Sequence, residues 1–237
     1  MPTKNAATPK EPSEDGVKWQ AQKSSMTRDR ILDATIDGFI KLGYSKLTTT
    51  QVADIAGISR GAMRHHFDSK KELIQAAIEH LHKKLLGIYF HNLSSIPQGL
   101  TGRELIRARV DAYWSYLNED LVLVHQELCM TARTEPELKD IITVMVKALD
   151  DQARQSVLGS LDDFEEDADR LFFIIDITRF NLEALARGKW QLSLYDDQLV
   201  ERQLQHLTLC IEQVVNDDGT TDLSKLFANY QNINQSP

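Results

Sequence analysis

The sequence is short of cysteine and of long apolar runs, and each shortage excludes a class of protein. Only Cys129 and Cys210 are present, and their spacing fits neither a disulfide framework nor a zinc site. No apolar run approaches the roughly 20 residues of a membrane-spanning helix. The first residues also lack the apolar core of a secretory signal. These absences predict a protein of the reduced cytoplasm with no membrane partner.

The chain also lacks the alternation of apolar and polar residues that strands require, internal repeats, and a glycine-rich phosphate loop. No Ser/His/Asp or Cys/His catalytic arrangement is recognisable, and the histidines lack the spacing of metal ligands. We therefore expect an all-α protein that is not an enzyme and holds no metal or cofactor. A helical enzyme that uses a cavity in its body is the alternative from another class.

The net charge of −8 is unevenly distributed. Residues 18–84 hold 12 Lys and Arg against 7 Asp and Glu, a balance of +5, whereas residues 85–237 hold 13 against 25, a balance of −12. A basic N-terminal domain on an acidic body is expected when only one end of a protein meets the phosphates of DNA.

The residues that organise the chain are 48–67, which predict two short helices around a tight turn. Thr48 followed by Gln51 is a capping-box pattern, and Gly57 suits the left-handed residue after a helix. Ser59 can cap a second helix, from about Arg60 to His66, whose buried side chains would be Met63 and Phe67. This is the pattern of a helix-turn-helix, whose second helix enters the DNA major groove. A helix pair that binds no nucleic acid is the alternative.

The segments Ile55–Gly61 and His66–Leu73 resemble the DNA-binding signature of TetR-type transcriptional regulators. The resemblance covers about Thr27 to Ile78 and departs from the family at Arg64, where a tyrosine is usual, so base preference cannot be carried over there. It implies DNA contacts at nine positions: Thr49, Thr50, Arg60, Gly61, Ala62, Arg64, His65, His66 and Lys70.

Apolar spacing and helix-end residues predict the rest of the chain. Residues 1–24 are expected to be a disordered arm, whose lysines could touch DNA or remain solvated. A first helix is expected from Thr27 to Leu42, completing a three-helix DNA-binding domain over residues 25–70. Residues 71–216 should form a helical ligand-binding and dimerisation domain, with helix stops at Gly159 and Gly188, and residues 217–237 a polar tail.

The predicted body combines apolar side chains with a few polar groups, the mixture that a ligand pocket needs. An ordinary helical core would have the same composition, but the resemblance implies that a pocket exists. The candidate lining residues are Tyr113, Trp114, Leu117, His125, Cys129, Met145 and Phe173. Apolar stripes on the last two long helices suggest a dimer seam, which the resemblance also implies, although packing within one chain is the alternative. The seam candidates are Ile175, Thr178, Leu182, Leu185, Leu199, Leu207, Ile211 and Val214.

These features together predict a homodimeric TetR-like repressor that binds a palindromic operator in double-stranded DNA. A small apolar or amphipathic effector is expected to release it. The alternative within the same class is a global or activating regulator without a small-molecule inducer.

Overall fold

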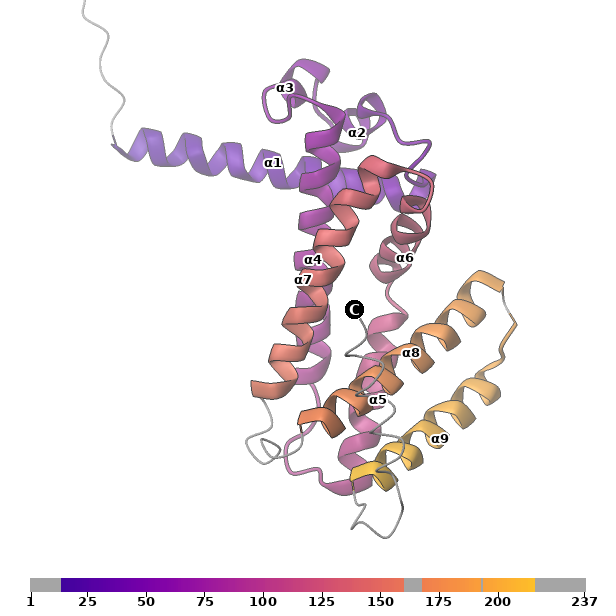
Figure 1. The fold of residues 1–237 in the computed structure, drawn as a ribbon. Coiled ribbons are helices and arrows are strands. Elements are labelled where there is room, and N and C mark those ends of the chain that lie inside the picture. Colours follow the sequence, from indigo (N-terminus) through magenta and orange to yellow (C-terminus); the bar gives the residue numbers. More distant parts are fainter. Residues whose placement is uncertain (1–13, 160–167, 193, 216–237) are drawn as a thin grey trace, which may run out of the picture. The chain divides into compact units, whose positions relative to one another are not determined.

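The computed structural model describes residues 14–159, 168–192 and 194–215, and within these ranges the chain forms helices and no strands. This confirms the all-α prediction. The chain divides into two compact units, Met1–His80 and Leu81–Pro237. The helices are α1 Glu14–Leu42, α2 Thr49–Ala56, α3 Arg60–Arg64, α4 Lys70–Ser94, α5 Gly102–Leu117, α6 Asp120–Ala132, α7 Pro136–Gly159, α8 Ala168–Leu192 and α9 Asp197–Val215 (Figure 1).

The first unit contains α1, α2, α3 and the first turns of α4. Helix α1 packs against α2. The apolar core of this unit includes the buried residues Ile31, Phe39, Leu47 and Val52. The unit boundary lies inside α4, after His80, whereas the sequence analysis ended the DNA-binding domain at residue 70. His80 Nε2 lies 2.9 Å from Asp33 Oδ1, which links α4 to α1 within this unit.

Helix α1 begins at Glu14, well before the predicted start at Thr27. The expectation of disorder is therefore wrong for residues 14–24, and the extra turns run out beyond α2 and α3 (Figure 1). Residues 14–26 contain no proline, and the run from Lys18 to Lys23 includes two Lys, two Gln and one Ala, which favour a helix. Thr27, expected to cap the helix, instead donates its hydroxyl to the Lys23 carbonyl inside it. The predicted arm residues 1–13 lie outside the described residues.

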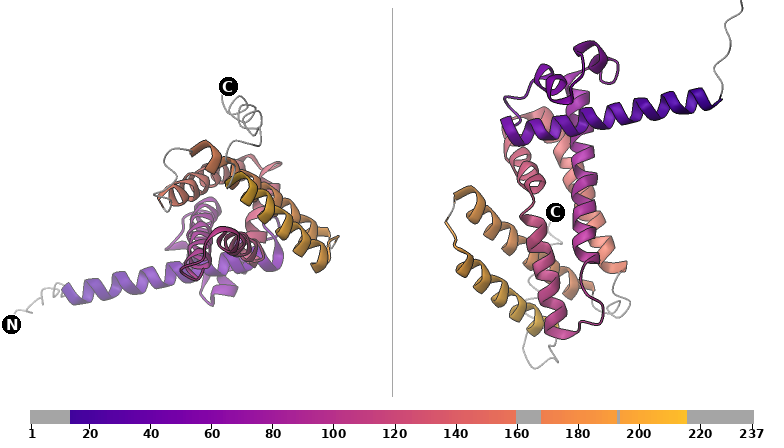
Figure 2. Two further views of the ribbon diagram at one scale, coloured as in Figure 1. Left: turned by 90° about the horizontal axis from the view of Figure 1, so that it is seen from below. Right: turned by 180° about the vertical axis from the view of Figure 1, so that it is seen from behind.

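In the second unit, α5 packs against α6, α8 and α9, and α6 packs against α7. The last two described helices, α8 and α9, also contact each other and lie side by side in Figure 2. Charged side chains join α5 to α9: Arg107 donates two hydrogen bonds to the Glu201 carboxylate at 2.8 and 2.9 Å, and Arg103 pairs with Glu212. The helical body thus follows the predicted class.

Helix α8 continues through Gly188 to Leu192, so the predicted stop at Gly188 is wrong and Trp190 is helical. The reason is packing. A Cβ atom at position 188 would lie 1.9 Å from Cε2 of Tyr195, so glycine here allows the aromatic ring to approach the helix backbone. The predicted polar tail, residues 217–237, lies outside the described residues. No described helix is both long and apolar enough to cross a membrane.

Candidate nucleic-acid interface and ligand pocket

Local signals fix the first helix of the helix-turn-helix as predicted. The Thr48 hydroxyl accepts a hydrogen bond from the Gln51 N–H at 3.3 Å, and the Gln51 side chain accepts one from the Thr48 N–H at 2.9 Å. This reciprocal capping box starts α2. Gly57 ends the helix with φ of 64°, a left-handed conformation that glycine adopts without steric cost. Val52, Ala53 and Ala56 are buried, and their small size allows another helix to approach.

The second helix, α3, is shorter than predicted and ends at Arg64. The Ser59 hydroxyl accepts a hydrogen bond from the Ala62 N–H at 3.1 Å, which confirms Ser59 as its N-cap. Met63 and Phe67 are buried, at 6% and 4% exposure, as the sequence predicted. Since these two side chains face inward, the remaining side chains of α3 are left at the surface.

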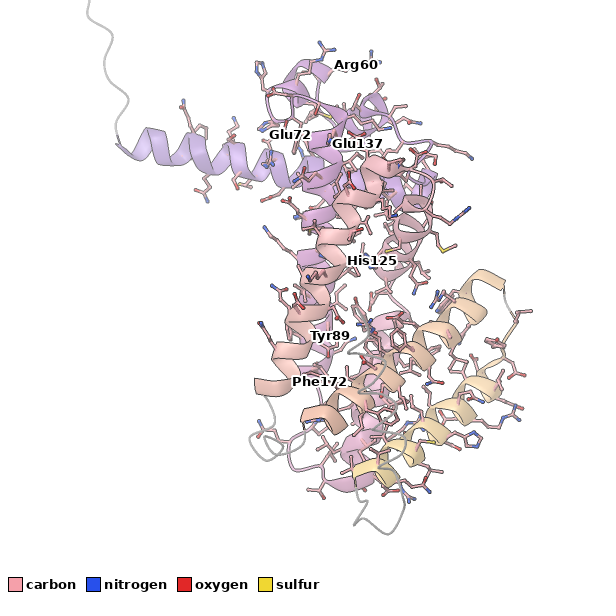
Figure 3. The ribbon with its side chains drawn as sticks, in the orientation of Figure 1. Arg60, Glu72, Tyr89, His125, Glu137 and Phe172 are labelled. Carbon is pink, nitrogen blue, oxygen red and sulfur yellow. The ribbon has the colours of Figure 1, made fainter. Side chains whose placement is uncertain are left out.

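The nine predicted DNA-contact residues all lie in the first unit, at the ends and outer face of its short helices. Arg60, Gly61, Arg64, His65 and Lys70 are exposed, whereas Thr49, Thr50, Ala62 and His66 are partly buried. Figure 3 shows Arg60 at the outer edge of α3, pointing away from α1 and α2. Lys70 begins α4, and its Nζ lies 5.9 Å from the centre of the Tyr44 ring. The exposed cations can therefore face a polyanion without rearrangement of the core.

Arg28 is a residue of this surface that the sequence analysis missed. Its Nη1 donates a hydrogen bond to the His66 carbonyl at 3.1 Å, and its guanidinium carbon lies 4.3 Å from the centre of the Phe67 ring. Both partners follow α3 directly, so a residue of α1 contacts the chain where α3 ends. Sequence spacing cannot reveal this contact, because 38 residues separate Arg28 from His66.

In the second unit, the predicted pocket residue Tyr113 packs among aromatic and acidic side chains. The Tyr113 hydroxyl donates to Glu183 Oε1 at 3.4 Å, and the Tyr113 ring stacks on Tyr116 with centres 5.7 Å apart. Burial, and then the nearby Glu183 carboxylate, raises the pKa of Tyr113 well above its ordinary range. Leu117 is fully buried, whereas Trp114, Met145 and Phe173 are partly exposed.

The predicted pocket residues His125 and Cys129 lie together and are partly buried, with the Cys129 Sγ 3.6 Å from His125 Nε2. The His125 ring lies 5.5 Å from that of His82, centre to centre, and no described atom pairs with His125 Nδ1 or His82 Nε2. Burial, with a smaller contribution from His82, lowers the pKa of His125 to about 4. Burial also raises the pKa of the Cys129 thiol, which therefore stays protonated and is a poor nucleophile. No three described His, Cys, Asp or Glu side chains are grouped as a metal site would require.

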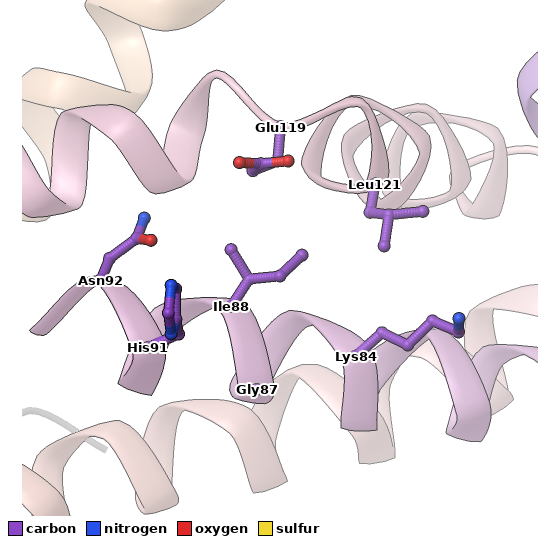
Figure 4. Close-up of a pocket in the computed structure, with 7 residues that line it drawn as sticks. All are labelled: Lys84, Gly87, Ile88, His91, Asn92, Glu119 and Leu121. Carbon is purple, nitrogen blue, oxygen red and sulfur yellow. The ribbon is translucent and has the colours of Figure 1, made fainter. Parts of the chain in front are cut away.

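A pocket of about 410 Å³ lies between α4 and the corner that joins α5 to α6 (Figure 4). Ile88 and Leu121 supply apolar walls, and Asn92 donates a hydrogen bond from its Nδ2 to the Ala112 carbonyl at 3.3 Å. The seven lining residues are Lys84, Gly87, Ile88, His91, Asn92, Glu119 and Leu121. None of the predicted pocket residues is among them.

The residues of the predicted dimer seam differ in their exposure within the single chain. Leu182, Leu185, Leu207 and Ile211 are between 1% and 9% exposed, so neighbours within the chain already cover them. Ile175, Thr178, Leu199 and Val214 are partly exposed. The large apolar side chains that α8 and α9 do expose include Phe180, at 56%, and Leu209, at 41%.

The sequence model of the family described as bacterial regulatory proteins, tetR family, matches residues 31–77. Over 67 residues the chain is 36% identical to the HTH-type transcriptional regulator TtgR of Pseudomonas putida, covering 28% of this chain and 32% of that protein. Over 196 residues it is 24% identical to an uncharacterized HTH-type transcriptional regulator of Mycobacterium tuberculosis, covering 81% and 96%. The match to TtgR thus spans about a third of that relative's length.

Solved structures share the fold over most of the chain. A TetR transcriptional regulator from Chloroflexus aurantiacus matches with a TM-score of 0.59 and 24% identity, covering 81% of this chain and 97% of that chain. A transcriptional regulator from Rhodococcus sp. Rha1 matches with a TM-score of 0.57 and 23% identity, covering 78% and 96%. The helix-turn-helix thus lies within the residues that match the tetR family model, and the fold over most of the chain is shared with solved structures of transcriptional regulators.

Proposed function

We propose that the chain is a DNA-binding transcriptional regulator that reads its operator with α3. The observation that carries this proposal is the exposed cluster on and beside a capped helix: Arg60, Arg64 and His65 project outward while Met63 and Phe67 hold the inner face. Such a helix can enter the major groove without exposing apolar surface. The positive balance of residues 18–84 supports the same role, because phosphate contacts supply much of DNA affinity.

The proposed contacts divide into two kinds. Arg60 and Arg64 have the reach and planar geometry to read guanine, and Ala62 could touch a thymine methyl group. Thr49, Thr50 and Lys70 lie at helix starts, where they and the backbone N–H groups suit phosphate. His65 and His66 complete the set of positions proposed to face DNA.

The test begins with duplexes selected by the full chain from random-sequence DNA, and compares them with scrambled duplexes. Arg64→Ala should weaken binding to the selected duplex by roughly 1–3 kcal/mol and relax one base position. Lys70→Ala should weaken both duplexes alike and lower the salt slope by about one unit. An equal loss on both duplexes for Arg64→Ala would make Arg64 a phosphate contact instead.

We further propose that the regulator is a repressor released by a small apolar or amphipathic ligand bound in the second unit. Two features support a site there: the pocket of about 410 Å³ with its apolar walls, and the buried polar atoms of His82 and His125 that have no described partner. Helix α4 carries pocket residues and also begins at Lys70, so it is the segment through which a ligand could act on DNA binding.

Release requires that the ligand bind the DNA-free state more tightly than the DNA-bound state. Allosteric couplings of this kind are typically about 1–3 kcal/mol, and they are reciprocal. A thermal-shift screen of metabolites and antibiotics would identify a ligand, whose affinity is then measured with and without saturating operator. Weaker ligand binding in the presence of operator supports the proposal, and equal affinities would leave a DNA binder that this ligand does not control.

A further inference from the structure

We infer that Arg28 is a positioning residue for DNA recognition, which fixes the C-terminal end of α3 from α1. This inference rests on the proposed function, because it concerns how the reading helix is held. Arg28 is not one of the nine positions that the family resemblance indicated, and it lies on a different helix from α3. Its role follows from the contacts at the end of α3.

Helix α3 cannot fix its own orientation. It has five residues, and Met63 is the one buried side chain described within it. Isolated helices of this length are not stable in water, so contacts from outside the helix must hold both ends. Ser59 caps the N-terminal end through the Ala62 N–H. At the other end, His65, His66 and Phe67 lead out of the helix, and their placement decides how the outer side chains are aimed.

Arg28 meets this end with two contacts that use different parts of the guanidinium. One N–H in the plane of the group donates to the His66 carbonyl at 3.1 Å, while the face of the group lies over the Phe67 ring at 4.3 Å. A planar cation can make both contacts at once, whereas a lysine ammonium has no face to stack. The positive charge near the carbonyl end of a helix is also favourable. Arg28 therefore ties two successive residues after α3 to α1.

The rival role is direct contact with a phosphate. Arginine has five N–H donors, and the His66 carbonyl uses one of them, so others remain that could reach DNA. The two roles predict different behaviour. A phosphate contact adds affinity for every sequence, whereas correct aiming of α3 matters only where base edges are read.

The experiment compares Arg28→Met, Arg28→Lys and Arg28→Gln with the wild-type full chain. Binding is measured on a duplex selected by the wild type and on a scrambled duplex, over a range of salt. We expect Arg28→Met to lose about tenfold or more in affinity for the selected duplex, as when a base contact is lost, with little change on the scrambled one. Arg28→Lys should bind the selected duplex almost as weakly as Arg28→Met does. Arg30→Met is the matched control, since Arg30 is exposed two residues away.

A coupling test follows from the stacking contact. Phe67→Leu removes the ring under Arg28, so its effect on operator preference should not add to that of Arg28→Met in the double variant. All variants are compared at a temperature where circular dichroism shows them folded. If Arg28→Met does not fold, Arg28→Gln and Arg28→Lys provide the same comparison.

Three results would overturn the inference. An equal loss on both duplexes, with a salt slope lowered by about one unit, would make Arg28 a phosphate contact. A lower melting temperature with unchanged preference for the selected duplex would make its role purely structural. Unchanged binding would remove any role. If the wild type itself shows no preference for any selected duplex, the proposed function fails first, which is a distinguishable outcome.

Discussion

Gly61 has room for a larger side chain within the protein. A Cβ atom there would meet nothing closer than the Ser59 hydroxyl oxygen at 3.9 Å, and its φ is not in the left-handed region. Alanine is a better helix former than glycine by roughly 1 kcal/mol, so folding alone would favour Gly61→Ala. The absence of a side chain is instead useful if DNA approaches this turn of α3 closely.

We therefore predict that Gly61→Ala keeps or slightly raises the free energy of unfolding while lowering affinity for the selected duplex. Gly87→Ala is the control, because Gly87 is also helical and also has open space around it. In ligand-free protein it should change stability in the same direction without affecting DNA binding. Denaturant unfolding measures the effect on stability, and duplex titrations measure the effect on DNA affinity. Wild-type DNA affinity in Gly61→Ala would contradict the idea that DNA approaches this turn of α3 closely.

His125 makes stability depend on pH in a defined direction. Its pKa is about 4 in the folded chain against an ordinary 6.5, so the unfolded chain takes up a proton at a pH where the folded chain does not. Its contribution is fully present above pH 6.5 and is lost as the pH falls toward 4. Between pH 7.5 and pH 5 the loss from this group should be about 2 kcal/mol.

Urea unfolding of the wild type and of His125→Gln at several pH values tests this prediction. The variant should lose less unfolding free energy between pH 7.5 and pH 5 than the wild type does. His206→Gln, at an exposed position on α9, should retain the wild-type pH dependence. Parallel pH profiles for wild type and His125→Gln would contradict the assignment to His125.

At the scale of elements, the sequence correctly predicted the helix ends that are set by residues close together in the chain. Thr48 with Gln51, Gly57 and Ser59 each act within a few residues of the chain, and the structure confirms all of them. The start of α1 and the continuation of α8 through Gly188 were mispredicted. Gly188 could end a helix or admit a neighbouring ring, and only the position of Tyr195 decides between the two.

This explanation of Gly188 predicts the effect of Gly188→Ala. The added Cβ would lie 1.9 Å from Tyr195, and such crowding typically costs about 1–3 kcal/mol, offset by up to roughly 1 kcal/mol of helix propensity. We expect a net loss of about 1 kcal/mol of stability by thermal or urea unfolding. The double variant with Tyr195→Ala should not show the crowding cost. A single variant as stable as the wild type would mean that Tyr195 moves aside freely.

The candidate site divides in the same way. The nine DNA positions could be named because a short motif indicates both their helix and their face, although their contacts stay predictions. The pocket and seam residues could not be named in this way, because apolar spacing does not tell which neighbour covers a side chain. Leu182 and Leu207 are covered within the chain, and the lining of the pocket came from Ile88, Leu121 and polar residues instead. Arg28 was missed because its partners are distant in sequence.

For the molecule as a whole, we propose that the predicted dimer forms through apolar side chains that the single chain leaves exposed. Phe180 on α8 and Leu209 on α9 are large, apolar and 56% and 41% exposed. Changing both to arginine would place two charges in an apolar seam, so we predict monomers by analytical ultracentrifugation and weak operator binding. Val144→Arg on α7, at a position 67% exposed, should leave the dimer intact. A double variant that still forms dimers would place the seam elsewhere.

The central claim is that the first unit reads a specific DNA sequence through α3. The most direct measurement is an equilibrium titration of the full chain with its selected duplex and with a scrambled duplex at one fixed salt concentration. The same titrations are repeated for the double variant that carries both Arg60→Ala and Arg64→Ala. We predict that the wild type prefers the selected duplex by about a thousandfold or more, and that the double variant loses most of this preference while still binding DNA weakly. Equal wild-type affinity for both duplexes, or an unchanged preference in the double variant, would contradict the claim.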